Sequence, residues 1–93
     1  MNLTKREILK RIDKGKTVKV ELEVEEGYIK NTMISGDFFA YPIEEFENLQ
    51  NAFKNKKATK GNMHRILEEY SKKITLSGIT FSDLEDIFSQ FGV

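Results

Sequence analysis

Apolar and polar residues alternate most regularly over residues 17–24, which read TVKVELEV. The apolar residues occupy every second position, and a lysine or a glutamate lies between them. Because the side chains of a strand point alternately to its two faces, this spacing predicts a strand with one buried face. The residues expected on that face are Val18, Val20, Leu22 and Val24.

A hairpin follows this strand. Residues 25–27, Glu-Glu-Gly, predict a tight turn, since glycine readily adopts positive φ. Residues 28–35 then return as a second strand, rich in β-branched and aromatic residues. Within this strand, Ile29 and Met33 are expected to share one face.

The second strand ends at Gly36 and Asp37, which lead directly into two adjacent phenylalanines. Residues 38–41 predict a third short strand, which would complete a small antiparallel β-meander. Adjacent residues of a strand point to opposite faces, so Phe38 and Phe39 are not expected to fill the same core. Either a helix covers one ring and a loop covers the other, or one ring faces another protein.

The N-terminal segment carries helix signals. Thr4 and Glu7 have the spacing of a capping box, and Gly15 is placed to end a helix. A short helix is therefore predicted over residues 4–12. Its apolar face would carry Ile8, Leu9 and Ile12.

Three further helices are predicted in the C-terminal half. One begins after Pro42, whose missing N–H is tolerated in a first helical turn. A basic connector, residues 54–61, separates it from a helix over residues 62–73, and a last helix begins near Ser82, which has capping-box spacing with Glu85. The apolar faces are expected to carry Ile43, Phe46, Leu49 and Phe53, then Met63, Ile66, Leu67 and Tyr70, then Leu84, Ile87, Phe88 and Phe91. This order of elements predicts an α+β fold, with helices on one face of a small antiparallel sheet.

Length and composition suit one folded domain over residues 1–93, with 39% hydrophobic and 32% charged residues. The net charge is zero, but residues 1–20 and 51–80 each carry seven basic and two acidic groups, whereas residues 21–50 carry one and eight. Such blocks either steer a partner of matching charge or are the solvated faces of separate elements. The even balance gives no support for nucleic-acid binding.

The chain contains no cysteine, which excludes disulfides, thiolate catalysis and Cys-bound metal clusters. No apolar run approaches membrane-spanning length, and the N-terminus lacks an apolar signal core. We therefore expect a cytoplasmic protein with no membrane partner. The initial Met and the absence of a tag favour a complete small gene product.

Few residues suggest chemistry. His64 is the only histidine and is expected to be an ordinary surface residue without a metal or catalytic role. Asp37 is either a turn residue or half of a carboxylate pair with Glu44 or Glu45. The lysine-rich residues 54–60 form either a solvated connector or a contact with phosphate or a partner. The residues by themselves indicate no catalytic centre and no metal site, which favours a binding or accessory module.

Residues 15–53 resemble the C-terminal accessory domain of lipoate–protein ligases. The shared features are a strand led by Gly-Lys, a hairpin, a strand ending in Gly-Asp-Phe-Phe, a nearby proline and an amphipathic helix. The matching residues are Gly15, Lys16, Gly36, Asp37, Phe38, Phe39 and Pro42. A looser C-terminal match involves Gly78, Ser82, Asp86 and Ile87.

The resemblance implies a non-catalytic accessory subunit of a two-chain lipoate–protein ligase, with a fold like that of iron–sulfur scaffold proteins. Such ligases convert lipoate and ATP into lipoyl-AMP and transfer the lipoyl group to a lysine of an acceptor domain. ATP, Mg²⁺ and lipoate would be held by the catalytic subunit, so this chain would bind no cofactor alone and would serve lipoyl acceptor domains indirectly. Residues at the partner interface, or closing the active site, would be Gly36, Asp37, Phe38, Phe39, Tyr41 and Pro42. Lys16 would lie on the phosphate side.

Two other classes are compatible with the residues. One is a stand-alone binding or regulatory module, such as a homodimer that buries the second phenylalanine against another copy. The other, less favoured, is a small enzyme whose site the sequence does not reveal.

Overall fold

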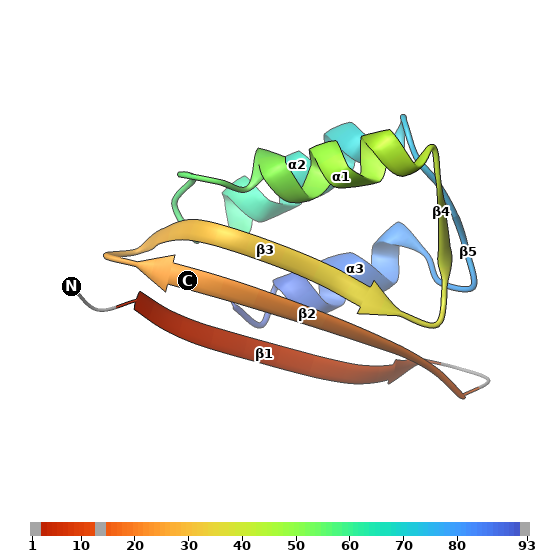
Figure 1. Ribbon diagram of the computed structural model, residues 1–93, viewed down its shortest axis with the longest axis horizontal. Coiled ribbons are helices and arrows are strands. Elements are labelled where there is room, and N and C mark those ends of the chain that lie inside the picture. Colours follow the sequence, from red (N-terminus) through yellow and green to blue (C-terminus); the bar gives the residue numbers. More distant parts are fainter. Residues whose placement is uncertain (1–2, 13–14, 92–93) are drawn as a thin grey trace.

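The computed structural model describes residues 3–12 and 15–91 of the chain. The elements, in order, are β1 (Leu3–Ile12), β2 (Lys16–Glu25), β3 (Tyr28–Gly36), β4 (Phe39–Tyr41), α1 (Ile43–Ala52), α2 (Lys60–Ser71), β5 (Thr75–Ser77) and α3 (Phe81–Phe88). Strands β1, β2 and β3 form an antiparallel sheet in sequential order, and the helices cover one of its faces (Figure 1). The predicted α+β fold with an antiparallel meander is confirmed.

Strand β1 takes the place of the helix predicted over residues 4–12. All ten of its residues pair with β2. Ile8 and Ile12 are half-buried against the core, whereas Leu9 is exposed. The open edge of β2 offers a full ladder of backbone hydrogen bonds and an apolar surface, which together outweigh a local capping signal. The helix prediction was wrong because tertiary pairing overrode it.

Strands β2 and β3 form the predicted hairpin, and both residues of its turn have positive φ. Beside Val24 the register skips Lys30, so β3 carries one residue more than β2 at this point. Because such a bulge breaks the alternation of faces, Ile29 and Ile34 are both buried and Met33 is exposed. The expectation that Ile29 and Met33 share a face was therefore wrong.

The short strand β4 does not join the meander. It pairs with β5 in a separate two-stranded sheet. The predicted meander thus has the right number of strands but takes its third strand from the N-terminus. β5 was not among the predicted elements, because a three-residue strand has no periodicity of its own.

The helices bury the faces that their apolar spacing predicts, with Ile43 as the exception. Phe53 and Phe88 stack at the centre of the core, with ring centroids 4.8 Å apart and an interplanar angle of 6°. Fully burying side chains of this size stabilises the fold by about 1.5–3 kcal/mol each. The buried helix-side residues are Phe46, Leu49, Phe53, Met63, Ile66, Leu67, Leu84, Ile87, Phe88 and Phe91. Within residues 3–12 and 15–91, no helix is long and apolar enough to cross a membrane.

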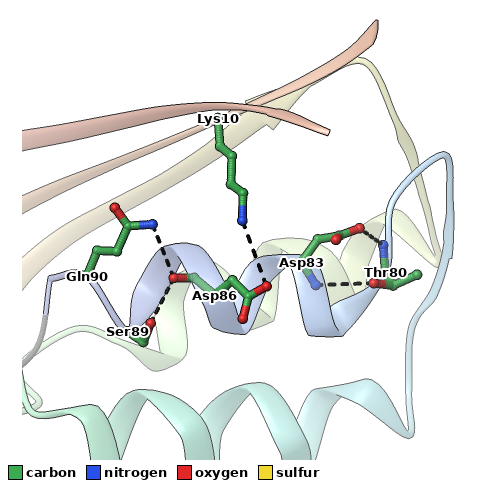
Figure 2. A network of polar contacts seen from close by, with 6 residues as sticks. All are labelled: Lys10, Thr80, Asp83, Asp86, Ser89 and Gln90. Carbon is green, nitrogen blue, oxygen red and sulfur yellow. Dashed lines mark hydrogen bonds and ion pairs between the residues drawn. The ribbon is translucent and has the colours of Figure 1, made fainter. Parts of the chain in front are cut away.

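Helix α3 begins at a capping box, two residues before the predicted one. The Thr80 hydroxyl accepts a hydrogen bond from the Asp83 amide (3.1 Å), and the Asp83 carboxylate accepts one from the Thr80 amide (2.9 Å) (Figure 2). The predicted pair, Ser82 and Glu85, was wrong, since both lie inside the helix. Figure 2 also shows Lys10 of β1 reaching Asp86 of α3 at 3.8 Å. This exposed ion pair contributes at most about 1 kcal/mol.

Candidate functional site

The Gly-Asp turn closes the end of β3 onto the start of β2. Gly36 has φ +150°, and a Cβ atom built on it would lie 2.2 Å from the carbonyl oxygen of Thr17. Asp37 donates its amide to that same oxygen (2.9 Å), and its carboxylate accepts a hydrogen bond from the Thr17 amide (3.3 Å). These contacts give Asp37 the turn role and make glycine necessary at position 36. They also fix the direction in which the chain enters β4.

The two phenylalanines after the turn face different surroundings. Phe38 is half-buried and packs edge-to-face on Phe46 of α1, with centroids 5.7 Å apart. Phe39 is 69% exposed. Tyr41 lies on the same side of β4 as Phe39, because residues two apart on a strand share a face, and the intervening Ala40 is buried. One ring therefore supports the core, and the other is left to solvent.

A groove of about 610 Å³ runs from the end of β3 along β4 to the first turn of α1. It brings together five of the predicted interface residues, Gly36, Phe38, Phe39, Tyr41 and Pro42. Its other lining residues are Ile34, Ser35, Ala40, Ile43, Glu44 and Phe46. Concave apolar surfaces of this size are typical of sites that bind a ligand or a partner side chain.

One groove residue, Ile43, was predicted to lie on the buried face of its helix but lies at the surface. Ile43 was expected in the core but is 60% exposed beside Tyr41, which is 62% exposed. A usable signal was present, because Phe39, Tyr41 and Ile43 follow one another at the two-residue spacing of a strand face. Glu44 in the first turn of α1 adds a negative charge to the groove lining.

The remaining candidates lie outside the groove. Lys16 is exposed at the start of β2, next to the Thr17 that binds Asp37. His64 of α2 contacts two carboxylates, Glu68 at 3.0 Å from its Nε2 and Glu85 of α3 through its Nδ1. Across the described ranges, no group of three or more histidine or acidic residues is placed to hold a metal ion. His64 thus links two helices at the surface.

The carboxylate of Glu85 raises the pKa of His64 above its usual value by accepting a hydrogen bond and by its negative charge. Desolvation opposes this shift, and Glu68 adds to it. The folded domain therefore binds a proton at His64 more tightly than the unfolded chain does.

Comparison with known proteins identifies the domain. The family model for the C-terminus of bacterial lipoate protein ligase matches residues 5–88. The chain belongs to this family. The resemblance inferred from the Gly-Asp-Phe-Phe turn is thereby confirmed, and the groove lies within the matched residues.

One solved structure shares the fold. It describes a bipartite lipoate protein ligase and its E2 lipoyl domain from Thermoplasma acidophilum. The match has a TM-score of 0.80 at 18% sequence identity and covers 94% of this chain and 97% of the other. No curated protein matches the sequence. At this identity the likeness concerns the fold, and it extends over nearly the whole of both chains.

Replacing Gly36 with alanine is expected to destabilise the domain by about 2 kcal/mol or more, because the new Cβ clashes with the Thr17 carbonyl in a backbone conformation that favours glycine. Gly61→Ala in α2 is the matched control, since its Cβ would meet nothing within 4 Å and alanine favours helix. Urea unfolding measures both. Equal stability of Gly36→Ala and the wild type would contradict the assigned role of the turn.

The raised pKa of His64 makes stability depend on pH with a defined sign. The stabilising contribution of protonated His64 is fully present below the unfolded pKa of about 6.5 and is lost as the pH rises through the higher folded pKa. The free energy of unfolding of the wild type, relative to His64→Gln, should therefore fall as the pH rises from about 6.5 through the folded pKa. Glu85→Gln should weaken this dependence. Parallel pH profiles for the wild type and His64→Gln would refute the assignment.

Proposed function

We propose that this chain is the non-catalytic accessory subunit of a two-chain lipoate–protein ligase. Its membership of the ligase C-terminal family supports this, as does its end-to-end fold match to a chain of similar length from a bipartite ligase. The observation that carries the proposal is the exposed apolar row of Phe39, Tyr41 and Ile43 beside a rigid turn. In this proposal the catalytic subunit covers that row and fills the groove.

The row has the properties of an interface anchor. Its side chains project from a strand and a helix start that are fixed by the Gly36–Thr17 contact and by the packing of Phe38 on Phe46. Rigid aromatic residues lose little conformational freedom on binding and are enriched among the residues that dominate interface energy. Burying them in a partner also removes a contiguous apolar surface from water.

The chemistry explains why such a subunit would be needed. A carboxylate oxygen of lipoate attacks the α-phosphorus of ATP, the bond to the pyrophosphate oxygen breaks, and lipoyl-AMP and pyrophosphate form. The reacting groups and Mg²⁺ must be held in line and shielded from water, since hydrolysis would destroy the mixed anhydride. A domain docked beside the site can order its loops and limit the entry of water.

The described part of this chain offers a docking surface, and the reaction is assigned to the catalytic subunit. That subunit holds ATP, Mg²⁺ and lipoate, and the lysine of the acceptor reacts there with lipoyl-AMP. This chain therefore serves acceptor domains indirectly in the chemical step. Lys16 is the one residue that we assign to the phosphate side, and a cytoplasmic setting, where ATP is available, completes the proposal.

Formation of lipoyl-AMP by the cognate catalytic subunit tests the proposal, with and without this chain at saturating ATP, Mg²⁺ and lipoate. We expect the adenylate only when the chain is present. Phe39→Ala should weaken binding to the catalytic subunit by about 2 kcal/mol, or about 30-fold in Kd, while changing the free energy of unfolding by less than about 0.5 kcal/mol.

Leu9→Ala is the matched control, because Leu9 is 65% exposed on β1 and lies outside the groove. It should leave both binding and adenylate formation unchanged. Phe38→Ala should instead lower stability, since that ring packs on the core. Adenylate formation that does not need the chain would disprove the accessory role. A stable dimer of the chain alone, disrupted by Phe39→Ala, would favour the homodimer alternative.

A further inference from the structure

A cluster of five lysines lies at one end of the molecule. Three belong to the connector between α1 and α2, one is the first residue of α2 and one is on β3; all five are exposed. No carboxylate oxygen among the described residues lies within 4 Å of any of them, whereas Lys10, Lys19 and Lys73 each have such a partner. The members of this lysine cluster are Lys30, Lys54, Lys56, Lys57 and Lys60.

The loop that carries the lysine cluster is held in place by backbone hydrogen bonds. Ile29 of β3 accepts from the Asn55 amide (2.7 Å) and donates to the Lys56 carbonyl (2.8 Å). Ala58 donates to the Gly27 carbonyl of the hairpin turn (2.9 Å). The loop that carries the lysines is thus already ordered in the free domain. Less conformational entropy is therefore lost when a partner binds.

An apolar hollow of about 370 Å³ opens beside the lysine cluster. Lys57 and Arg6 line it, together with the apolar side chains of Val24, Ala58 and Phe91. The Arg6 guanidinium lies 5.4 Å from the centre of the Phe91 ring. An apolar hollow bordered by cations suits an apolar side chain that is flanked by carboxylates.

The lysine cluster and the groove lie at opposite ends of the molecule. α1 starts beside β4, which borders the groove, and ends at the connector, which carries the cluster (Figure 1). Ten helical residues separate the two by about 15 Å. A partner that contacts only the groove therefore leaves the lysine cluster accessible to a second protein.

We infer that the lysine cluster docks the protein that accepts the lipoyl group, through an acidic segment of that acceptor with an apolar side chain seated in the hollow. This inference rests on the proposed function, in which the groove is occupied by the catalytic subunit. Charge complementarity of this kind accelerates encounter and fixes orientation more than it adds raw affinity. The cluster thereby delivers the acceptor to a reaction carried out on the other subunit.

The test is lipoyl transfer by the two-subunit enzyme to an unlipoylated acceptor domain, measured at low and high salt. The triple variant Lys54→Gln, Lys56→Gln, Lys57→Gln should raise the KM for the acceptor about tenfold at low salt, with the rate of lipoyl-AMP formation unchanged. High salt should remove most of the difference, because it screens exposed charges. The matched control, Arg11→Gln, Lys72→Gln, Lys73→Gln, loses the same net charge from exposed positions outside the hollow and should keep the wild-type KM.

Each other outcome overturns the inference in a recognisable way. An unchanged acceptor KM in the lysine triple variant, with adenylate formation still dependent on the chain, refutes acceptor docking and leaves the accessory role intact. Loss of adenylate formation or of catalytic-subunit binding in that variant assigns the lysines to the subunit interface instead. An equal rise in KM for both triple variants means that only net charge matters. Adenylate formation that does not need the chain removes the proposed function itself.

Discussion

The close approach of Gly36 to the Thr17 carbonyl is the contact on which the arrangement of the site depends. No side chain fits between the two strands there, and Asp37 completes the junction by binding both backbone groups of Thr17. The chain is thereby turned out of the three-stranded sheet and into β4, which pairs with β5 instead. Had the chain continued along β3, Phe38 and Phe39 would have lain on the two faces of one sheet. The turn instead places one ring against α1 and leaves the other outside.

In the proposed function, this arrangement assigns stability and partner binding to different residues. Phe38 closes the edge of the core through its contact with Phe46, which sits in the helix that also borders the groove. Phe39 and Tyr41 are exposed, so in the proposed function they can contact a partner without any loss of core packing. A domain with such a small core has a small free energy of unfolding. Because Phe38 packs on the core and Phe39 does not, an aromatic side chain can be exposed at this surface without removing one from the core.

Local sequence patterns predicted much of this fold where a segment's own residues determine its structure. The alternation in β2, the hairpin turn and the apolar spacing of α1, α2 and α3 all appear as expected. The predictions were wrong where contacts with a distant segment determine the local structure. β1 is a strand because β2 offers an open edge, and the bulge at Lys30 exposes Met33, which was expected to share a face with Ile29. The family resemblance led us to expect Phe39 at the surface, whereas the exposure of Ile43 became apparent only once β4 was placed.

Photo-crosslinking from position 39 tests the central claim, that the row led by Phe39 faces the catalytic subunit, most directly. A photoreactive aromatic residue would replace Phe39 in one preparation and the equally exposed Leu9 in another. The account predicts efficient crosslinking to the catalytic subunit from position 39 and little from position 9. Formation of the complex with no crosslinking from position 39, or with equal crosslinking from both positions, would contradict it.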